Sequence, residues 1–431
     1  MHVLISGASV AGPVLAYWLR RNGHRVSVVE RTSELRVGDG GQAVDILGPA
    51  VEVIDRMGLL PQVRAARTTT DTMTLIRPGR ADVTIDAAQL LAGVSDRHVE
   101  IMRGDLAEIL YEATRKHVAY TFGTTIQELR EHDGGVDATF SDGTKGTFDL
   151  VVGADGLHSG VRRLVFGPEE DYSHFLGGYL AVFSVPDFIG LDGQVLGYNT
   201  VDRAVALYPT RTPGRTRVVI LFRAPQPDNR APQADNRAPQ ADRRDPRPDN
   251  REQQADHRDP AAQRRLLREV CAGLGWEVPR LLEHLDAADD FYLDGISQIR
   301  LPSWSRGRVT LAGDAGYGPG PAVGGGSSLA VVGAYVLASE LAAAGDDHAV
   351  AFPAYERAMA DAVAASRTVG PSVLATLIPR SELQVWTMAQ AMRLLPRLPG
   401  FLQRRLTSFG GGPAAMLNGV DLRPPVAPAT L

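Results

Sequence analysis

The sequence predicts an α/β protein with a parallel-sheet domain, an interleaved domain of mixed or antiparallel strands, and a helical C-terminal region. Three observations support this prediction. An apolar strand, a glycine-rich turn, a helix and a second strand follow one another from Val3 to Glu30. A second glycine-rich connection between a strand and a helix lies at 308–341. Between them, four short strand-like segments at 177–222 are typical of an antiparallel sheet.

The length and composition of the chain exclude several classes of protein. Its 431 residues are enough for two domains that share a substantial core. The formal net charge of −5 argues against nucleic acid as a partner. Cys271 is the only cysteine, so we predict no disulfide and no metal site, and we expect a cytoplasmic protein. No stretch reaches about 18 uninterrupted apolar residues, so we expect no stable membrane insertion.

The first 30 residues have the order of a dinucleotide-binding unit. The strand at 3–6 leads into the turn GASVAG, a helix is expected from about Val10 to Asn22, and a second strand ends at Glu30. Gly7 allows a tight turn, Gly12 allows close packing of helix and strand, and Ser9 takes the place of the usual middle glycine. An ordinary α/β start without a ligand is the alternative to this interpretation.

Glu30 is the acid that such a unit places on the adenosine ribose. It follows Gly12 by 18 residues, close to the usual spacing of about 20. A carboxylate at this position disfavours a 2′-phosphate, so FAD or NAD fits better than NADP. One helix end and one acid contribute too little free energy to retain a cofactor, because nanomolar binding needs about 12 kcal/mol. We therefore expect further contacts from distant parts of the chain.

The stretch RVTLAGDAGYGPGPAVGGG supplies such contacts. A short strand at 309–312 ends at Gly313 and Asp314, a loop rich in glycine and proline follows, and a helix is expected from about Ser327 to Leu341. Ser327 or Ser328 is the predicted N-cap. Asp314 is placed to accept hydrogen bonds from a polyol, and the glycines let a flat ligand approach the backbone. The alternative is an ordinary glycine-rich loop.

Two further motifs lie in the first half of the chain. Arg103 opens a helix expected to run to about Lys116, where it could pair with a phosphate or form a surface salt bridge. The stretch VVGADGLHSGVRR, at 151–163, is a second corner in which an acid, Asp155, and glycines precede a helix.

Three of these motifs, GASVAG with Glu30, VVGADGLHSGVRR and RVTLAGDAGYGPGPAVGGG, together resemble the class A flavoprotein monooxygenases, the family of para-hydroxybenzoate hydroxylase. Within that family the chain is most similar to bacterial enzymes that hydroxylate aromatic polyketides or tetracycline-type compounds. The resemblance extends over nearly the whole chain. It implies one tightly bound, non-covalent FAD, with NADPH or NADH as a transient co-substrate. The residues that it assigns to the cofactor site are Gly7, Ser9, Ala11, Gly12, Glu30, Arg31, Gln42, Arg103, Asp155, Gly156, Gly313, Asp314, Pro321, Gly324, Gly325, Gly326 and Ser327.

The chain departs from the family pattern at three positions. Tyr317 stands where the family usually has histidine, Ser328 where it has asparagine, and Gly333 where it has a later aspartate. Tyr317 could hydrogen-bond substrate or flavin, or simply pack. No catalytic base is evident from the sequence, and Asp45 and Tyr317 are candidates for substrate contact.

The resemblance also implies a division of the chain into interleaved domains. We predict a discontinuous, Rossmann-type FAD-binding domain at 1–70, 98–170 and 290–345. The substrate domain would comprise 71–97 and 171–289, and the C-terminal helical region 346–431. Its helices are expected at 349–367, 371–377, 381–395 and 400–406, with Trp386 in the core, over the pocket, or in a dimer contact.

A tandem repeat with a seven-residue period fills 224–258. It has no apolar heptad positions and proline recurs in it, which argues against a coiled coil. We predict a disordered or extended insertion at 224–260, either a product of repeat expansion or a spacer or partner contact.

The function implied by the resemblance is hydroxylation of an aromatic or polyketide-like small molecule. NAD(P)H would reduce FAD, O₂ would form a C4a-hydroperoxyflavin, and its distal oxygen would pass to the substrate. The enzyme would be a monomer or homodimer. Two alternatives remain open from the sequence: an FAD-dependent reductase of isoprenoid double bonds on the same fold, and a non-catalytic FAD-binding protein.

Overall fold

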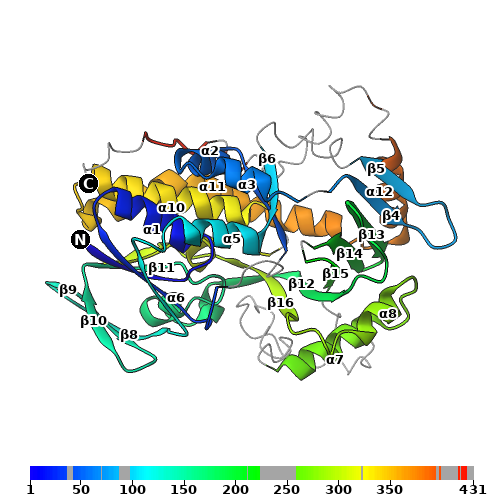
Figure 1. Cartoon of the computed structure of the whole chain (residues 1–431), viewed down its shortest axis with the longest axis horizontal. Coiled ribbons are helices and arrows are strands. Elements are labelled where there is room, and N and C mark those ends of the chain that lie inside the picture. The colour runs from blue at the N-terminus through cyan, green and yellow to red at the C-terminus, as the bar shows by residue number, and fades with distance from the viewer. Residues whose placement is uncertain are drawn as a thin grey trace, which may run out of the picture.

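The computed structural model describes residues 1–35, 42–68, 70–86, 98–210, 212–223, 259–321, 324–394, 398, 416–417 and 419–424. The repeat predicted to be disordered lies outside the described residues, as does the helix expected at 400–406. The chain forms two sheet regions joined along one side by long helices (Figure 1). The predicted α/β class, with several sheets and a helical C-terminal region, is confirmed.

The first region is built on a six-stranded sheet in the order β17-β18-β11-β1-β2-β7. All its neighbouring strands are parallel except β17 and β18. The strands are β1 (His2–Ser6), β2 (Arg25–Glu30), β7 (Ala119–Phe122), β11 (Leu150–Gly153), β17 (Ser305–Arg306) and β18 (Val309–Leu311). Strands from both ends of the chain therefore lie next to one another at its centre.

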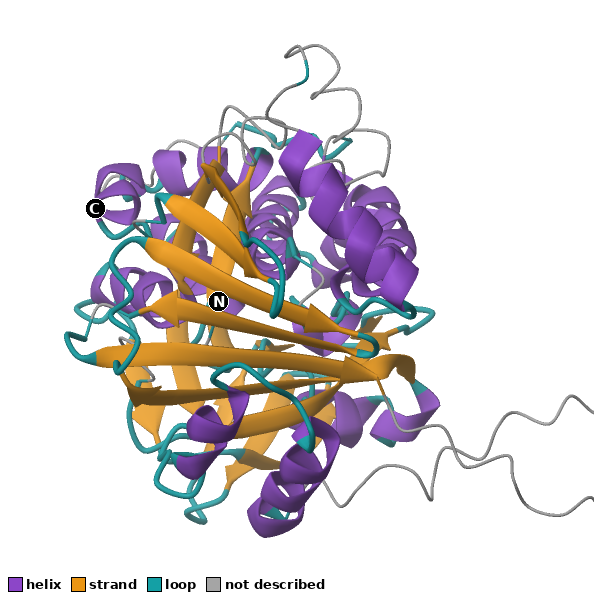
Figure 2. Cartoon of the chain, turned by 90° about the vertical axis from the view of Figure 1, so that its right-hand side faces the viewer, coloured by secondary structure: helices purple, strands orange, loops and turns teal. Residues whose placement is uncertain are grey.

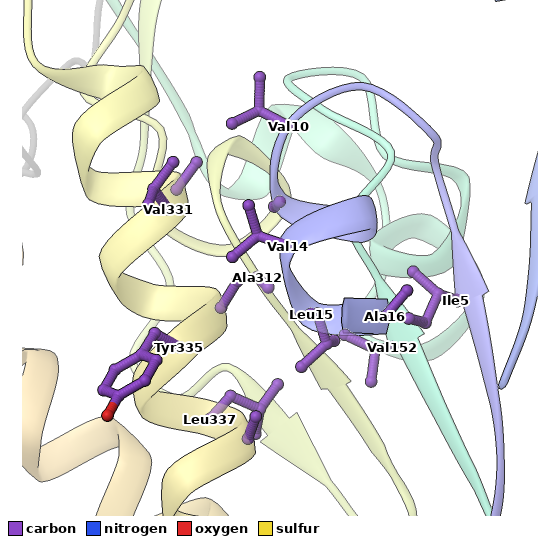
Figure 3. Close-up of a cluster of buried hydrophobic side chains, with 14 of the residues drawn as sticks. Ile5, Val10, Val14, Leu15, Ala16, Val152, Ala312, Val331, Tyr335 and Leu337 are labelled. Carbon is purple, nitrogen blue, oxygen red and sulfur yellow. The ribbon is translucent and has the colours of Figure 1, made fainter. Parts of the chain in front are cut away.

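Two helices cover one face of this sheet and pack against each other. They are α1 (Ala11–Arg21) and α10 (Gly326–Ala343). Val10 and Val14 of the α1 side face Val331 of α10 in one apolar cluster (Figure 3). By length and composition α10 is the one helix of the described chain that could cross a membrane, but 72% of that helix is buried inside the protein.

The second region is a seven-stranded sheet in the order β16-β12-β15-β14-β13-β4-β5. Figure 2 shows these strands with helices on both sides. They are β4 (Thr72–Ile76), β5 (Val83–Asp86), β12 (Ser173–Pro186), β13 (Gln194–Thr200), β14 (Arg203–Pro209), β15 (Arg215–Arg223) and β16 (Tyr292–Ile299). All pairs are antiparallel except β13 with β4. One face carries an apolar cluster beneath α7 (Pro260–Cys271) and α8 (Val278–Glu283).

The position of β16 corrects one predicted boundary. The sequence analysis assigns 290–345 to the FAD-binding domain, but β16 pairs with β12 along the edge of the seven-stranded sheet. Residues 292–299 thus belong to the second region, and the chain returns to the first sheet only at β17. An isolated strand carries no local sign of which sheet it joins, because pairing is decided by distant residues.

Smaller elements complete the first region. A two-stranded antiparallel ladder joins β3 (Ala43–Leu47) to β6 (His98–Met102). A three-stranded antiparallel sheet consists of β8 (Ile126–His132), β9 (Gly135–Phe140) and β10 (Lys145–Phe148). The remaining helices are α2 (Pro49–Arg56), α3 (Leu60–Ala65), α5 (Arg103–Glu112), α6 (Gly160–Val165), the 3₁₀ turn η1 (Glu169–Asp171) and α9 (Asp314–Tyr317).

The C-terminal helices connect the two regions. Helix α11 (His348–Leu377) is one helix of 30 residues, whereas the sequence predicts a break before Pro371. Tyr355 and Met359 of its first half belong to the core of the first region, and Leu374 packs on the seven-stranded sheet. Helix α12 (Glu382–Leu394) then contacts β5 and β13. Its Trp386 is exposed, not in the core.

Tyr317 is part of the core, which favours packing, one of its two predicted roles, over contact with substrate or flavin. Its hydroxyl lies 2.8 Å from the hydroxyl of Tyr355, which donates to the carbonyl of Leu311, and its ring packs against Trp304. A Cβ atom at Gly333 would overlap with the Tyr317 hydroxyl and lie 3.1 Å from its Cζ. The tyrosine and the glycine, two separate departures from the family pattern, therefore depend on each other.

This dependence predicts a non-additive pair of substitutions. We expect Gly333→Ala to lower the free energy of unfolding by about 1–3 kcal/mol, because it overfills a packed core. Tyr317→Phe alone should cost about 0.5–1.5 kcal/mol through its lost hydrogen bond. In the double variant the phenylalanine ring no longer has the oxygen that the new methyl group meets. Urea denaturation of the unmodified protein, the two single variants and the double variant measures this effect. The double variant should lose clearly less free energy of unfolding than the two single variants lose together, and simple additivity would contradict the proposed contact.

Candidate functional site

The glycine turn after β1 is a crossing of three stretches of backbone. Gly7 has φ of 110°, and a Cβ atom on it would overlap with the carbonyl of Ala154 at the end of β11. A Cβ atom on Gly12 would overlap with the carbonyl of Gly7. Only glycine fits at both positions. The turn therefore packs β1, α1 and β11 against one another, and Ala11 is buried in it.

Glu30, at the end of β2, holds this turn. Its carboxylate accepts hydrogen bonds from the backbone N–H of Ala8 (2.9 Å) and from the N–H of Thr32 (3.0 Å). The carboxylate therefore stands beside the glycine turn, where the sequence places a ribose. Arg31, which follows, is exposed.

Arg103 reaches the same turn from the end of β6. Its guanidinium donates to the Ser9 hydroxyl at 3.3 Å, which joins two predicted cofactor residues that are far apart in sequence. Its backbone N–H donates to the carbonyl of Gln42 at 3.1 Å, so Gln42 also lies here. This contact favours the cofactor interpretation of Arg103 over an ordinary surface salt bridge, since no carboxylate of the described chain bonds it.

Asp314 presents a carboxylate that has no hydrogen-bond partner among the residues that the structure describes. Burial raises the pKa of this carboxyl, and the positive charge of Arg103 opposes that rise. No donor in the described chain bonds it, and a Cβ atom on Gly326 would lie 3.9 Å from one of its oxygens. A carboxylate in such surroundings is costly unless hydrogen bonds satisfy it. A ligand with hydroxyl groups would supply those bonds.

The loop after Asp314 leads to the start of α10. Gly313, Gly324 and Gly325 all have positive φ, and Gly325 caps the helix. The prediction of Ser327 or Ser328 as N-cap is wrong. No side chain caps this end and no acid lies in its first turn, so its free N–H groups are available to an acceptor. Pro321 and Ser327 are half-buried beside them.

Ser328 has a different role from capping. Its hydroxyl donates to the carbonyl of Asp45 at 2.7 Å and accepts from the N–H of Leu47 at 2.9 Å. This pair of bonds fixes β3 to the first turn of α10. The side chain of Asp45 is thereby held near the cofactor residues, and its role toward a substrate stays a prediction.

The carboxylate of Asp155 forms hydrogen bonds with other groups of the protein. Its carboxylate accepts from the N–H groups of Gly160 (2.9 Å) and Val161 (3.2 Å), and from the hydroxyls of Ser159 (2.5 Å) and Ser6 (3.3 Å). These bonds join the start of α6 to the end of β1. Gly156 has φ of 83°. A direct contact of either residue with a cofactor stays a prediction.

The sequence analysis missed a charged cluster that lies beside this corner. His158 bonds Asp294 of β16 at 2.7 Å and Glu169 at 2.8 Å, and these bonds raise the pKa of His158 to about 10. The Tyr292 hydroxyl donates to Asp294, and Arg162 pairs with Glu169. His158 stands inside a quoted motif, but its partners come from elements that only the fold brings near.

The cluster connects the turn region to the seven-stranded sheet. The charges of Arg103 and Asp314 both act on the Tyr292 hydroxyl, so the start of β16 faces the same space as the predicted cofactor residues. The N–H of Ile299, at the other end of β16, donates to the carbonyl of Gly318. Among the described residues no group of three His, Cys, Asp or Glu side chains is placed to hold a metal ion.

The backbone crossing, the ribose acid and the partnerless Asp314 define a protein that binds a dinucleotide with a polyol chain, and FAD is such a molecule. A model of the FAD binding domain family matches residues 1–270, and the chain belongs to this family. FAD is its cofactor, and the chain is an FAD-dependent monooxygenase.

Three comparisons support this assignment. A flavin-dependent monooxygenase of Legionella longbeachae is 32% identical, over 88% of this chain and 90% of that protein. An uncharacterized protein of Mycobacterium tuberculosis is 39% identical, over 82% of this chain and 88% of that one. The crystal structure of the tetracycline destructase Tet(55) has a TM-score of 0.76 at 30% identity and covers 98% of each chain.

The partnerless carboxylate predicts that FAD affinity depends on Asp314. We expect Asp314→Asn to weaken FAD binding about 10- to 100-fold, because hydrogen bonds to a charged group contribute about 1.5–3 kcal/mol. Titration of the apoprotein with FAD, followed by flavin fluorescence, measures the dissociation constant. Asp361→Asn, at an exposed position on α11, is the matched control and should leave the constant unchanged. Equal affinity of the two variants would remove Asp314 from the cofactor site.

The pairing of His158 predicts a pH-dependent stability. Its folded-state pKa of about 10 lies above the ordinary 6.5, so its contribution is complete below pH 6.5 and is lost between there and about pH 10. One coupled proton changes the free energy of unfolding by about 1.4 kcal/mol per pH unit. The change caused by His158 should be only a fraction of this value, because its side chain is partly exposed to solvent. Urea midpoints measured from pH 6 to pH 10 should fall less steeply for His158→Gln than for the unmodified chain.

The carboxylate of Asp294 is the main cause of that shift. In Asp294→Asn, an NMR titration should find the His158 pKa well below the value of the unmodified protein. A His158 pKa that stays near 10 in this variant would contradict the assigned cause.

Proposed function

We propose that this monooxygenase uses NADPH or NADH and O₂ to hydroxylate a neutral aromatic or polyketide-like small molecule in the cytoplasm. The observation that carries the proposal is the Asp314 carboxylate, which no donor in the described chain bonds and which lies close enough to Arg103 for that charge to oppose the rise of its pKa on burial. A cofactor held there would lie near the seven-stranded sheet, because β16 of that sheet ends in a hydrogen bond to Gly318 of the same loop. The tetracycline destructase named above supports a polycyclic, hydroxylated substrate.

The first region would hold FAD in a Rossmann-type arrangement. Glu30 and Ser9 would bind the ADP half, Arg103 the phosphates, and Asp314 the ribityl hydroxyls. The N–H groups at the start of α10 would donate hydrogen bonds to acceptor atoms on a polar edge of the cofactor. The bound flavin supplies hydride acceptance and oxygen activation, and the protein supplies binding and orientation.

The tasks left to the chain are to orient the substrate and exclude water. The seven-stranded sheet has an apolar cluster on the face that meets α11, with Leu180, Leu221 and Ile296 against Leu374. Apolar surroundings suit a flat ring system and keep bulk water away. The single cysteine is buried and free, in keeping with a reducing compartment. A transient nicotinamide partner and a monomer or homodimer complete the proposal.

Oxygen transfer can be tested directly. The purified protein should show a flavin spectrum, and NADPH or NADH oxidation under air should accelerate when the matching substrate is added. We would test tetracycline and trihydroxyanthraquinone with labelled O₂, and expect a product that carries one labelled oxygen atom. The relatives named above as monooxygenases favour this result over the reductase alternative.

Other results would change the conclusion in specific ways. Flavin reduction that yields a reduced product without labelled oxygen would support the reductase. Bound FAD that no nicotinamide cofactor reduces would support a non-catalytic FAD-binding protein. A protein that binds no FAD would overturn the whole proposal, including the roles of Glu30 and Asp314.

A further inference from the structure

The ladder of β3 and β6 has one apolar face and one mixed face. The mixed face, called the polar face below, carries Asp45, His98 and Glu100 beside the buried Leu47 and Met102. Val44, Ile46, Val99 and Ile101 point toward the core of the first region. Because side chains alternate along a strand, Asp45 and Glu100 must lie on the opposite face. They are direct partners in the antiparallel register, so their side chains are neighbours across the ladder.

Asp45 forms a close pair with a histidine on this polar face. One carboxylate oxygen lies 2.6 Å from Nε2 of His98, and this bond raises the pKa of the imidazole. The two side chains are 37% and 7% exposed, so the carboxylate remains reachable while the histidine does not. The second carboxylate oxygen has no partner within the described chain.

Glu100 stands beside this pair in a less exposed position. Burial raises the pKa of its carboxyl, and the Asp45 charge adds to the rise. The Thr68 hydroxyl donates to one of its oxygens. The site therefore combines the Asp45–His98 pair with a second carboxyl group directly across the ladder.

Tyr208 faces this polar surface from the other region. On β14, Val205 and Leu207 point into the cluster under α7 and α8, so Tyr208 points to the opposite face. Burial and then the charges of Glu100 and Asp45 raise its pKa to about 12. Its hydroxyl has no hydrogen-bond partner among the described residues. The residue is partly exposed, so its hydroxyl is open to a ligand.

These groups are unfavourable for the fold alone. Two acids directly across a ladder repel each other, and burying one of them adds a desolvation cost. The backbone of Asp45 is nevertheless fixed by Ser328 to the first turn of α10, the helix that starts at the cofactor site. The polar face is thus held at a set position relative to that site. Figure 1 shows β6 between the helices of the first region and the strands of the second.

We propose that Asp45, Glu100 and Tyr208 form the polar end of the substrate site and select neutral, polyhydroxylated aromatic or enolic substrates over aromatic carboxylates. A substrate hydroxyl donates to the free oxygen of Asp45 or to Glu100, and a substrate carbonyl oxygen accepts from the Tyr208 hydroxyl. An aromatic carboxylate meets a fixed negative charge there and is rejected. The proposal rests on the hydroxylase function proposed above and names its substrate class.

The test compares two probes of similar shape on the FAD-loaded protein. Trihydroxyanthraquinone carries neutral hydroxyl groups, and anthraquinone carboxylate carries an anion. Dissociation constants come from flavin fluorescence and from equilibrium dialysis, so no turnover is needed. We expect the unmodified protein to bind the hydroxylated probe at least about tenfold more tightly than the carboxylate probe. The carboxylate is repelled by the negative charge of the site and cannot donate a hydrogen bond to Asp45.

Substitution of Asp45 should invert part of this preference. In Asp45→Asn the amide oxygen still accepts from His98, so the pair and the fold are retained. The hydroxylated probe should bind about tenfold more weakly and the carboxylate about tenfold more tightly. A general structural defect would weaken both, so the opposite changes identify the charge. Glu100→Gln keeps an acceptor oxygen and should hold the affinity for the hydroxylated probe within about threefold, whereas Glu100→Ala should lose it.

Asp137→Asn, on the distant strand β9, is the matched control and should change neither constant. Asp45→Asn without tighter carboxylate binding would overturn the proposal. So would an unmodified holoprotein that binds neither probe or prefers the carboxylate. FAD content, measured first on each sample, separates these outcomes from a failure of the hydroxylase proposal, in which no flavin is retained or no labelled oxygen is transferred.

Discussion

The backbone crossing at Gly7 is the constraint on which the rest of the structure depends. Main chain meets main chain there, because side chains at Gly7 or Gly12 would overlap with the carbonyls of Ala154 and Gly7. The contact fixes β1, α1 and β11 against one another and brings the ends of parallel strands to one edge of the sheet. Residues that follow those strands, such as Ser9 and Glu30, share this edge because of backbone geometry. Their positions depend little on side-chain packing, which tolerates more substitution than a contact between two backbone segments does.

The electrostatics of that edge are incomplete without a ligand. Glu30 is satisfied by two backbone N–H groups, whereas among the described residues no donor bonds the Asp314 carboxylate and the Arg103 guanidinium has only the Ser9 hydroxyl. One anion and one cation therefore remain to be paired by the same molecule. FAD carries hydroxyls for the first and phosphates for the second. Each such contact contributes about 1.5–3 kcal/mol, so several acting together account for tight retention of the cofactor, while any single one does not.

The sequence allowed the local units to be predicted and left the pairings between distant units undetermined. The strand, turn and helix of each motif lie within about 30 consecutive residues, so residue pattern alone predicts them. The sheet that β16 joins, the dependence of Tyr317 on Gly333, and the pairing of His158 with Asp294 need the tertiary fold. Ser328 illustrates the limit most clearly. A serine at a predicted helix start favours capping, but β3 lies close enough to take its hydroxyl instead.

The hydrogen bonds of Ser328 also explain how the cofactor and the substrate can be held at a fixed position relative to each other. The residues just before it begin α10 at the predicted cofactor site, and its hydroxyl fixes the backbone of Asp45 and Leu47. The apolar residues of β3 must face the core, so the core decides that Asp45 faces the other way. One helical turn thus positions both the cofactor end and the proposed polar end of the substrate site. Transfer of an oxygen atom needs the two reactants at a set distance, and small displacements cost rate steeply. A shift of α10 would move both sites together, which keeps their relative geometry intact even when the surrounding chain moves.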